Sequence, residues 1–67
     1  MQPHIERMIE EKEQLDERRD RLVAFFETNI FNSLDDAEKG RMRAQANFML
    51  RYSEVLGDRI EAAAGSA

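Results

Sequence analysis

The sequence predicts an all-α protein, an antiparallel two-helix hairpin that assembles into a homo-oligomeric helical bundle. The two helices are expected at about residues 3–28 and 36–61, where apolar residues recur at helical spacing. The short segment between them is rich in Asn and Ser, and helices joined by a short connection pack antiparallel. A chain of 67 residues is also small for an independent core, which favours assembly.

The first predicted helix begins at Pro3, whose missing N–H would be unpaired in a first turn anyway. Strong helix formers separate its apolar residues, which continue at helical spacing to about Thr28. These apolar residues are Ile5, Met8, Ile9, Leu15, Leu22, Phe25 and Phe26.

Residues 28–34 interrupt the helical pattern because their Asn and Ser side chains compete for backbone hydrogen bonds. The apolar residues within this segment are Ile30, Phe31 and Leu34. We expect these three side chains to form a plug over one end of the core.

The second predicted helix has Asp35 as its N-cap, and Glu38 is placed to complete an acidic form of the capping box. Two glycines weaken this helix, and Gly57 can mark a close approach of another backbone. The chain is interpreted as one helical domain, residues 1–62, followed by a flexible C-terminal tail, residues 63–67.

Two rows of the second helix repeat every seven residues, and they differ in chemistry. The apolar row is Met42, Met49 and Leu56, and its companion row is Gln45, Tyr52 and Arg59. With the turn near residue 32, antiparallel packing predicts facing positions. The apolar pairs are Leu22 with Met42, Leu15 with Met49, and Met8 with Leu56. The polar pairs are Lys12 with Tyr52 and Arg19 with Gln45, while Ile5 lies beside Arg59 and Ile60.

The polar companion row has two interpretations. Lys12, Arg19 and Arg59 cannot be buried unpaired, because each would cost several kcal/mol. In one interpretation their stems cover the seam and their charged ends reach water, with Tyr52 half-exposed. In the other, a second hairpin packs on this face and the row lines a polar site between subunits.

Self-association is expected because some apolar residues lie off the main seam, where a single hairpin would leave them in water. These residues are Ile9, Phe25, Phe48 and Val55. We therefore predict a homo-oligomer, a dimer or larger.

A second cluster of basic residues lies nearer the loop. Its members are Arg18, Arg19, Arg21, Arg41 and Arg43, and guanidinium groups bind phosphate in pairs of hydrogen bonds. This predicts a secondary anion site at Arg18, Arg21, Arg41 and Arg43. The alternative is a solvated lattice in which neighbouring acids neutralise the arginines.

Composition argues against several classes of function. A net charge of −4 disfavours a general DNA or anionic-membrane binder, and no apolar run approaches the roughly 18 residues of a membrane span. Without cysteine and with only His4, no metal site or cofactor is expected. No serine has a nearby histidine base, so we expect a protein that is not an enzyme.

Most of the chain carries motifs of one family. The N-terminal block is Arg7, Met8, Ile9, Glu10, Glu11, Lys12, Leu15, Asp16 and Glu17. Phe31 and Leu34 follow across the bend, and then Met42, Gln45, Met49, Tyr52, Leu56, Arg59 and Ile60. With Met42 in place of the usual Leu, this pattern resembles a family of very small bacteriophage proteins first named from a crAss-like phage.

The second half is also similar in layout to the helical hairpin of phage anti-CBASS and anti-Thoeris sponges, small oligomers that sequester cyclic nucleotide immune signals between subunits. Tyr52 occupies a place comparable to an aromatic there, but the Thr, the Leu-Glu pair and the Trp of that pattern are absent. The likeness is one of topology, so no binding residue is transferred from it.

The leading hypothesis is a phage anti-defence sponge that acts in the host bacterial cytoplasm and sequesters a small, cyclic nucleotide without cleaving it. Tyr52 would stack on a base, Gln45 would contact a base edge, and phosphates would meet Lys12, Arg19 and Arg59. The alternative is an oligomeric interaction module that binds a host or phage protein, such as a host defence protein, through its exposed apolar residues. A third hypothesis is an inhibitor that presents its acidic first helix.

Overall fold

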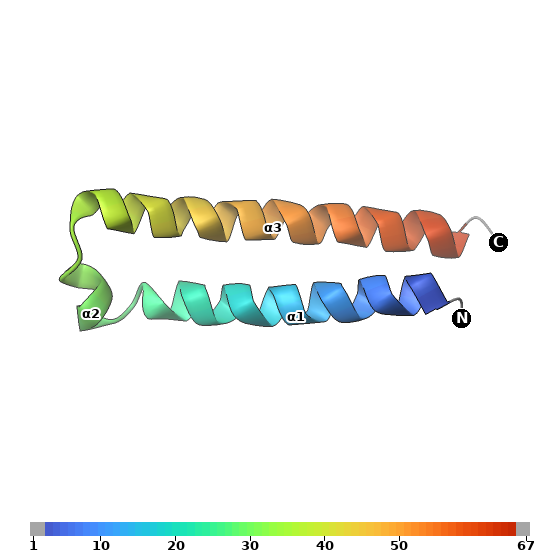
Figure 1. Cartoon of the computed structure of the whole chain (residues 1–67), viewed down its shortest axis with the longest axis horizontal. Coiled ribbons are helices and arrows are strands. Elements are labelled where there is room, and N and C mark those ends of the chain that lie inside the picture. The colour runs from blue at the N-terminus through green and yellow to red at the C-terminus, as the bar shows by residue number, and fades with distance from the viewer. Residues whose placement is uncertain (1–2, 66–67) are drawn as a thin grey trace.

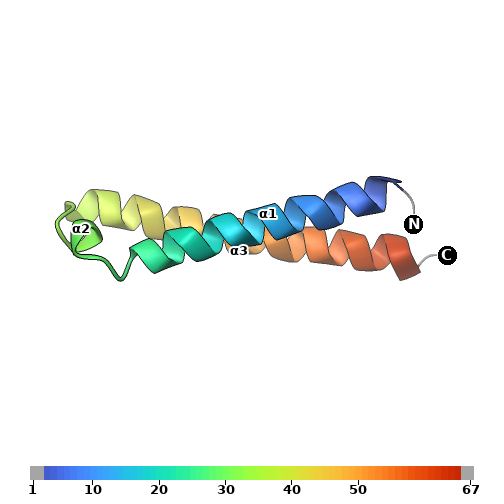
Figure 2. The ribbon, with the colours of Figure 1, turned by 90° about the horizontal axis from the view of Figure 1, so that it is seen from below.

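The computed structural model describes residues 3–65, which form a helical hairpin. Its helices are α1 (Pro3–Phe25), the short α2 (Asn29–Asn32) and α3 (Asp36–Gly65). The two long helices run antiparallel, with the start of α1 and the end of α3 at one end of the molecule and α2 at the other (Figures 1 and 2). The predicted hairpin is thus confirmed. None of these helices is long and apolar enough to cross a bilayer within the described residues.

Helix α1 ends three residues before the predicted end at residue 28, because Thr28 caps the next helix. Its hydroxyl accepts a hydrogen bond from the Phe31 N–H at 3.2 Å and donates one to the Phe25 carbonyl at 2.7 Å. Thr28 itself has extended backbone angles, so the chain turns there instead of continuing the helix.

Phe31 closes the loop end of the hairpin, with only 1% of its surface exposed. The Phe25 ring meets it edge-on at 6.0 Å between centroids, and the Phe26 ring lies at 4.8 Å. The other two residues of the predicted plug differ, since Leu34 is half-buried and Ile30 is 65% exposed. One turn of helix presents only one face to the core, and that face carries Phe31.

Asp35 caps α3 as predicted, because its carboxylate accepts a hydrogen bond from the Glu38 N–H at 2.7 Å. The Glu38 side chain accepts instead from Arg41 Nε at 2.8 Å, a contact along the helix surface rather than the return half of a capping box. Helix α3 also continues to Gly65, past the predicted end at residue 61.

The predicted tail is therefore helical over residues 63–65, and residues 66–67 lie outside the described residues. Alanine is the strongest helix former, and residues 62–64 are three consecutive alanines. Ala63 also packs against the core, which favours the last turns of α3.

The main core lies between α1 and α3, toward the end with the chain termini. Its buried members are Ile5, Met8, Leu15 and Leu56, with Ile9, Met49, Ile60 and Ala63 packed against them. Across this interface Lys12 bonds Ser53 and Arg19 bonds Ala46, each one position from the predicted partner. The predicted register is therefore correct to within one residue.

Candidate functional site

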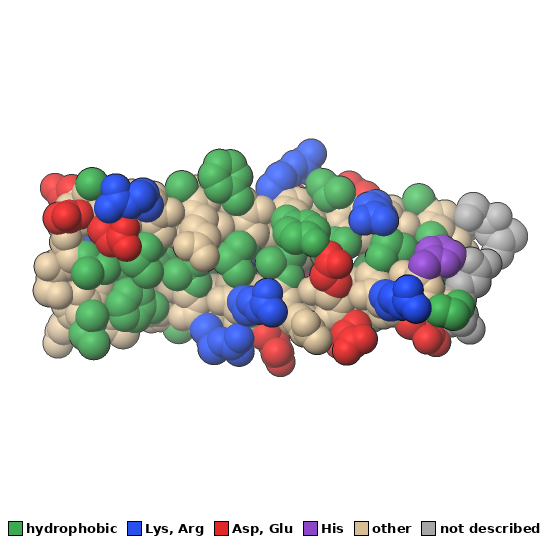
Figure 3. Space-filling view, in the orientation of Figure 1, with side chains coloured by type: hydrophobic (Ala, Val, Ile, Leu, Met, Phe, Trp, Pro, Cys, Tyr) green, Lys and Arg blue, Asp and Glu red, His purple; other side chains and the backbone are tan. Residues whose placement is uncertain are grey.

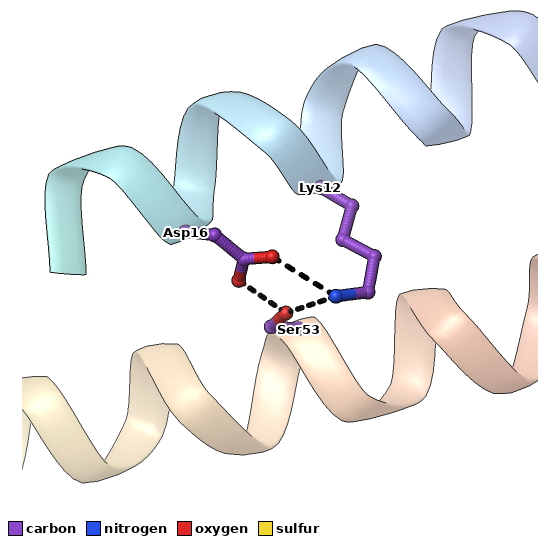
Figure 4. Close-up of polar contacts among 3 residues, drawn as sticks. All are labelled: Lys12, Asp16 and Ser53. Carbon is purple, nitrogen blue, oxygen red and sulfur yellow. Dashed lines mark hydrogen bonds and ion pairs between the residues drawn. The ribbon is translucent and has the colours of Figure 1, made fainter. Parts of the chain in front are cut away.

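A network of three polar side chains joins α1 to α3 at the middle of the hairpin (Figure 4). The Lys12 ammonium lies 2.9 Å from the Asp16 carboxylate and donates a hydrogen bond to Ser53 Oγ at 3.0 Å. The Ser53 hydroxyl in turn donates to the other oxygen of Asp16. Because Ser53 is only 3% exposed, this network satisfies polar groups inside the interface.

Asp16 is held in its charged form by this network. The hydrogen bond from Ser53, and after it the bond and charge of Lys12, lower the pKa of Asp16 below its ordinary value of 3.8. Lys12 reaches Ser53 by lying across α3 at Gly57, where an added Cβ would stand 3.3 Å from Lys12 Cε. The absence of a side chain at Gly57 thus makes room for the lysine stem.

The polar companion row is not the inner seam of α3, which corrects the sequence analysis. The buried or half-buried seam residues are Met42, Ala46, Met49, Ser53, Leu56, Ile60 and Ala63. Their alternating spacing of four and three residues is the helix-packing pattern. Gln45, Tyr52 and Arg59 precede it by one residue each and are exposed. The row that packs beside Met42, Met49 and Leu56 contains Ser53, and the spacing of four and three residues in the sequence could have identified it.

Lys12 and Arg19 lie on the inner seam of α1, apart from the exposed row on α3. Arg19 Nε donates a hydrogen bond to the backbone carbonyl of Ala46 at 3.1 Å. Both side chains are half-buried, so their stems cover the interface as the first interpretation of these residues holds. To contact a ligand, each would have to exchange its present hydrogen bonds.

A hollow of about 390 Å³ lies along the exposed side of α3. It is open to solvent and almost wholly apolar, and it is lined by Arg41, Ala44, Gln45, Phe48, Met49 and Tyr52. Phe48 is 73% exposed and Tyr52 is 49% exposed, so two aromatic rings one turn apart are available to another molecule. The sequence predicts Phe48 only as part of an apolar surface for another protein chain, and the structure places it beside Tyr52 in this hollow.

The outer stripe of α3 comprises Arg41, Gln45, Phe48, Tyr52, Val55 and Arg59, spaced by four and three residues. The Tyr52 hydroxyl donates a hydrogen bond to the Glu11 carboxylate, so this stripe adjoins the stripe of α1 that contains Glu11. That bond and partial burial raise the pKa of Tyr52 above its ordinary value of 10.0. The phenol is therefore uncharged near neutral pH.

The α1 stripe contains Arg7, Glu11, Gln14, Arg18 and Arg21, spaced by three and four residues. We call the two adjoining stripes the basic face. They carry five arginines, and all five are exposed. Figure 3 shows hydrophobic side chains in a band along the hairpin, with Lys and Arg on both sides of it and Asp and Glu side chains among them.

Positive charge predominates on the basic face although the whole chain carries −4. Glu11, the acid of the α1 stripe, accepts a hydrogen bond from Tyr52, and Glu38, one turn before the outer stripe begins, accepts one from Arg41. Of the predicted secondary anion site, Arg18, Arg21 and Arg41 share this face by their spacing.

Arg43, the fourth residue of that predicted site, lies elsewhere. Its guanidinium stands 5.2 Å from the centre of the Phe31 ring, and Lys39 Nζ stands 5.9 Å from the same centre. These cation–π contacts engage Arg43 at the loop end of the hairpin.

The Sequestin family model matches residues 2–62, which is nearly the whole chain. The chain belongs to the Sequestin family. The name of the Sequestin family indicates proteins that bind and sequester a partner. No curated protein and no solved structure matches the chain. In this Sequestin hairpin, the open apolar hollow lined by Phe48 and Tyr52, with Arg41 at its edge, is the candidate binding surface.

Proposed function

We propose that this chain is a phage-encoded anti-defence protein that sequesters a cyclic nucleotide immune signal between copies of itself in the host cytoplasm. The observation that carries the proposal is the outer stripe of α3, where two exposed aromatic rings lie between arginines. The sequestering role follows the Sequestin family. The phage origin and the ligand class follow the sequence resemblance.

Each part of a nucleotide has a matching group on the basic face. Phe48 and Tyr52 provide aromatic surfaces for a base, and such stacking contributes about 1–3 kcal/mol per base. Gln45 lies between Arg41 and Phe48 along the stripe and offers an amide to a base edge. Arg41 and Arg59 stand at the two ends of the stripe, where their guanidinium groups suit phosphates.

Lys12 and Arg19 remain part of the predicted ligand set, although the hairpin now engages both of them. Arg18 and Arg21 extend the positive charge of the basic face along α1 and attract the same anion. Arg43 is the least favoured of the predicted anion ligands because it lies over Phe31.

Binding without cleavage agrees with the titration behaviour of two groups, Tyr52 in the hollow and Asp16 in the interface network. A general acid or base works best when its pKa lies near the working pH. The pKa of Asp16 is lowered from 3.8 and the pKa of Tyr52 is raised from 10.0, both away from neutrality. We therefore propose that the ligand is held and released unchanged.

The second candidate function is an interaction module that binds a host or phage protein, including a host defence protein. It is favoured by the exposure of Phe48 and Val55, at 73% and 40%, on one helix face. A partner helix would place apolar side chains between them at helical spacing. The two functions differ in ligand class and are separable by one assay.

The assay is a thermal-shift panel of cyclic mono-, di- and trinucleotides. A ligand present at 100 times its dissociation constant stabilises the folded protein by about 2.7 kcal/mol, so a true ligand raises the melting temperature. Tyr52→Ala and Arg59→Gln should each abolish the shift, whereas Arg43→Gln should retain it. A shift that survives both of the first two variants would reject the site, and no shift with any nucleotide would reject the ligand class.

A further inference from the structure

Helix α3 carries two packing stripes, and the hairpin uses only one of them. The inner seam and the outer stripe have the same alternation of four and three residues, displaced by one position. One position on an α-helix is a rotation of about 100°. A helix at the corner of a four-helix bundle has two neighbours at roughly this angle, so α3 is built for a second neighbour.

The shape of the hairpin also calls for a partner. The chain exposes 5106 Å², whereas a compact protein of 7.8 kDa exposes about 4,400 Å². Its radius of gyration is 15.3 Å, against about 11 Å for a compact domain of this length. The excess of about 700 Å² approaches the roughly 800 Å² that each partner buries in a standard interface.

We propose that a second copy of this chain covers the outer stripe, with the two α3 helices packed antiparallel about a twofold axis near residue 50. The six positions of the stripe are spaced symmetrically about that residue, so the stripe is complementary to itself. The opposed pairs are Phe48 with Tyr52, Gln45 with Val55, and Arg41 with Arg59 of the second copy. Self-complementarity of this kind is what a twofold interface requires.

The same pairing creates two anion sites. Apolar and aromatic layers occupy the middle of the interface, and each of its ends brings Arg41 of one copy to Arg59 of the other. In the single hairpin Glu38 holds Arg41 in a surface ion pair, and an oxyanion between Arg41 and Arg59 takes the place of Glu38 and forms charge-assisted hydrogen bonds with both guanidinium groups. Phosphate-type anions therefore bind between the copies and strengthen their association.

This inference rests on the proposed function and deepens it, because it states which faces meet and where phosphates bind. Each nucleotide-binding hollow is incomplete in a single hairpin, since it is lined from α3 alone and lies open. The second copy supplies the second arginine and the opposing aromatic ring, and a bound base inserts between the two rings that pack on each other in the empty dimer. The two sites related by the axis are equivalent, so each dimer binds phosphate groups at two places.

Cysteine cross-linking tests the pairing in an otherwise cysteine-free chain. The double variant Gln45→Cys, Val55→Cys should give a covalent dimer in high yield on mild oxidation. Each single variant should remain uncross-linked, because neither position faces itself. The two cysteines are too far apart on one helix to bond within a chain. Dimers from the single variants, or none from the double variant, would overturn the antiparallel pairing.

Sedimentation with inorganic pyrophosphate tests the anion sites. At constant ionic strength, replacing chloride with pyrophosphate should tighten dimerisation at least tenfold. Arg41→Gln should remove that effect, whereas Arg51→Gln, which changes an exposed arginine off the outer stripe, should preserve it. Equal dimerisation in both salts would overturn the anion sites.

Phe48→Glu provides an independent check of the interface, with Ile30→Glu as its matched control. Both residues are exposed in the single hairpin, at 73% and 65%, so neither change disturbs the hairpin core. Only Phe48→Glu should yield monomers, and circular dichroism verifies that both variants are helical. If pairing fails these tests while a nucleotide still binds, this inference fails and the proposed ligand class stands. If the pairing is correct but no nucleotide binds, this inference stands and the proposed ligand class fails.

Discussion

Lys12 Nζ lies 3.0 Å from Ser53 Oγ, and this hydrogen bond ties the middle of α1 to the middle of α3. Asp16 bonds both groups, so the ammonium is neutralised where α1 meets α3. Sliding one helix along the other would leave Lys12 and Asp16 paired, since both lie on α1, but it would strip the buried Ser53 hydroxyl of its partners, at a cost of about 1–3 kcal/mol. The network therefore helps to fix the register of the hairpin.

Replacing Gly40 by Ala should stabilise the protein more than replacing Gly57 by Ala. Either change removes a helix-weakening glycine, which is worth up to about 1 kcal/mol. At Gly40 an added Cβ meets nothing within 4 Å, whereas at Gly57 it lies 3.3 Å from Lys12 Cε, and the lysine has to shift by a few tenths of an ångström. Urea unfolding of both variants measures the difference. Equal gains would show that the position of Lys12 does not contribute to stability.

Asp16 should make the protein sensitive to acid. Its pKa is lowered in the folded state, so its ionised form stabilises the fold above about pH 4, and this stabilisation is lost as pH falls through the lowered pKa. The difference in melting temperature between the wild-type protein and Asp16→Asn should be present at neutral pH and vanish at strongly acidic pH. The Ser53→Ala variant, which keeps Asp16, should lose stability at a higher pH than the wild-type protein does. A difference independent of pH would contradict this role.

Tyr52 should ionise at higher pH than a free tyrosine, and Glu11→Gln should return its pKa toward the ordinary value. The hydrogen bond to Glu11 is the main cause of the raised pKa, because it favours the protonated phenol. With one tyrosine and no tryptophan in the chain, ultraviolet absorbance follows this titration directly. Identical titration curves for the two proteins would exclude the contact.

Phe31→Ala should destabilise the hairpin by about 3 kcal/mol or more, because it removes a fully buried ring. Phe31 is 1% exposed and Phe48 is 73% exposed, so Phe48→Ala removes a ring of the same size from the surface. In dilute solution, where copies separate, Phe48→Ala should change stability by much less. Chemical unfolding at low protein concentration compares the two. Similar losses of stability in the two variants would contradict the assignment of Phe31 to the core.

The helices, the Asp35 cap and the hairpin register were predictable from the sequence because each depends on local chemistry or on periodic spacing. The end of α1 was not, since Thr28 serves α2 as a cap instead of continuing α1. The extension of α3 to Gly65 depends on packing of Ala63, which helix propensity alone does not reveal.

The candidate site was predicted in part. Gln45, Tyr52 and Arg59 were correctly grouped in one row, but the row lies on the outside of α3, one position from the inner seam. A shift of one residue rotates a side chain by about 100°, so a small error in register separates Lys12 and Arg19 from this row. Contacts such as Tyr52 with Glu11 depend on the angle between helices, which the sequence does not state.

Native mass spectrometry of the purified protein tests the central claim most directly, because it reports copy number and bound small molecules together. The account predicts an even number of chains that carries nucleotide, with the nucleotide recovered intact after denaturation. Tyr52→Ala should lose the nucleotide mass. A single folded chain at micromolar concentration, with no nucleotide bound before or after incubation with the cyclic nucleotide panel, would contradict the account.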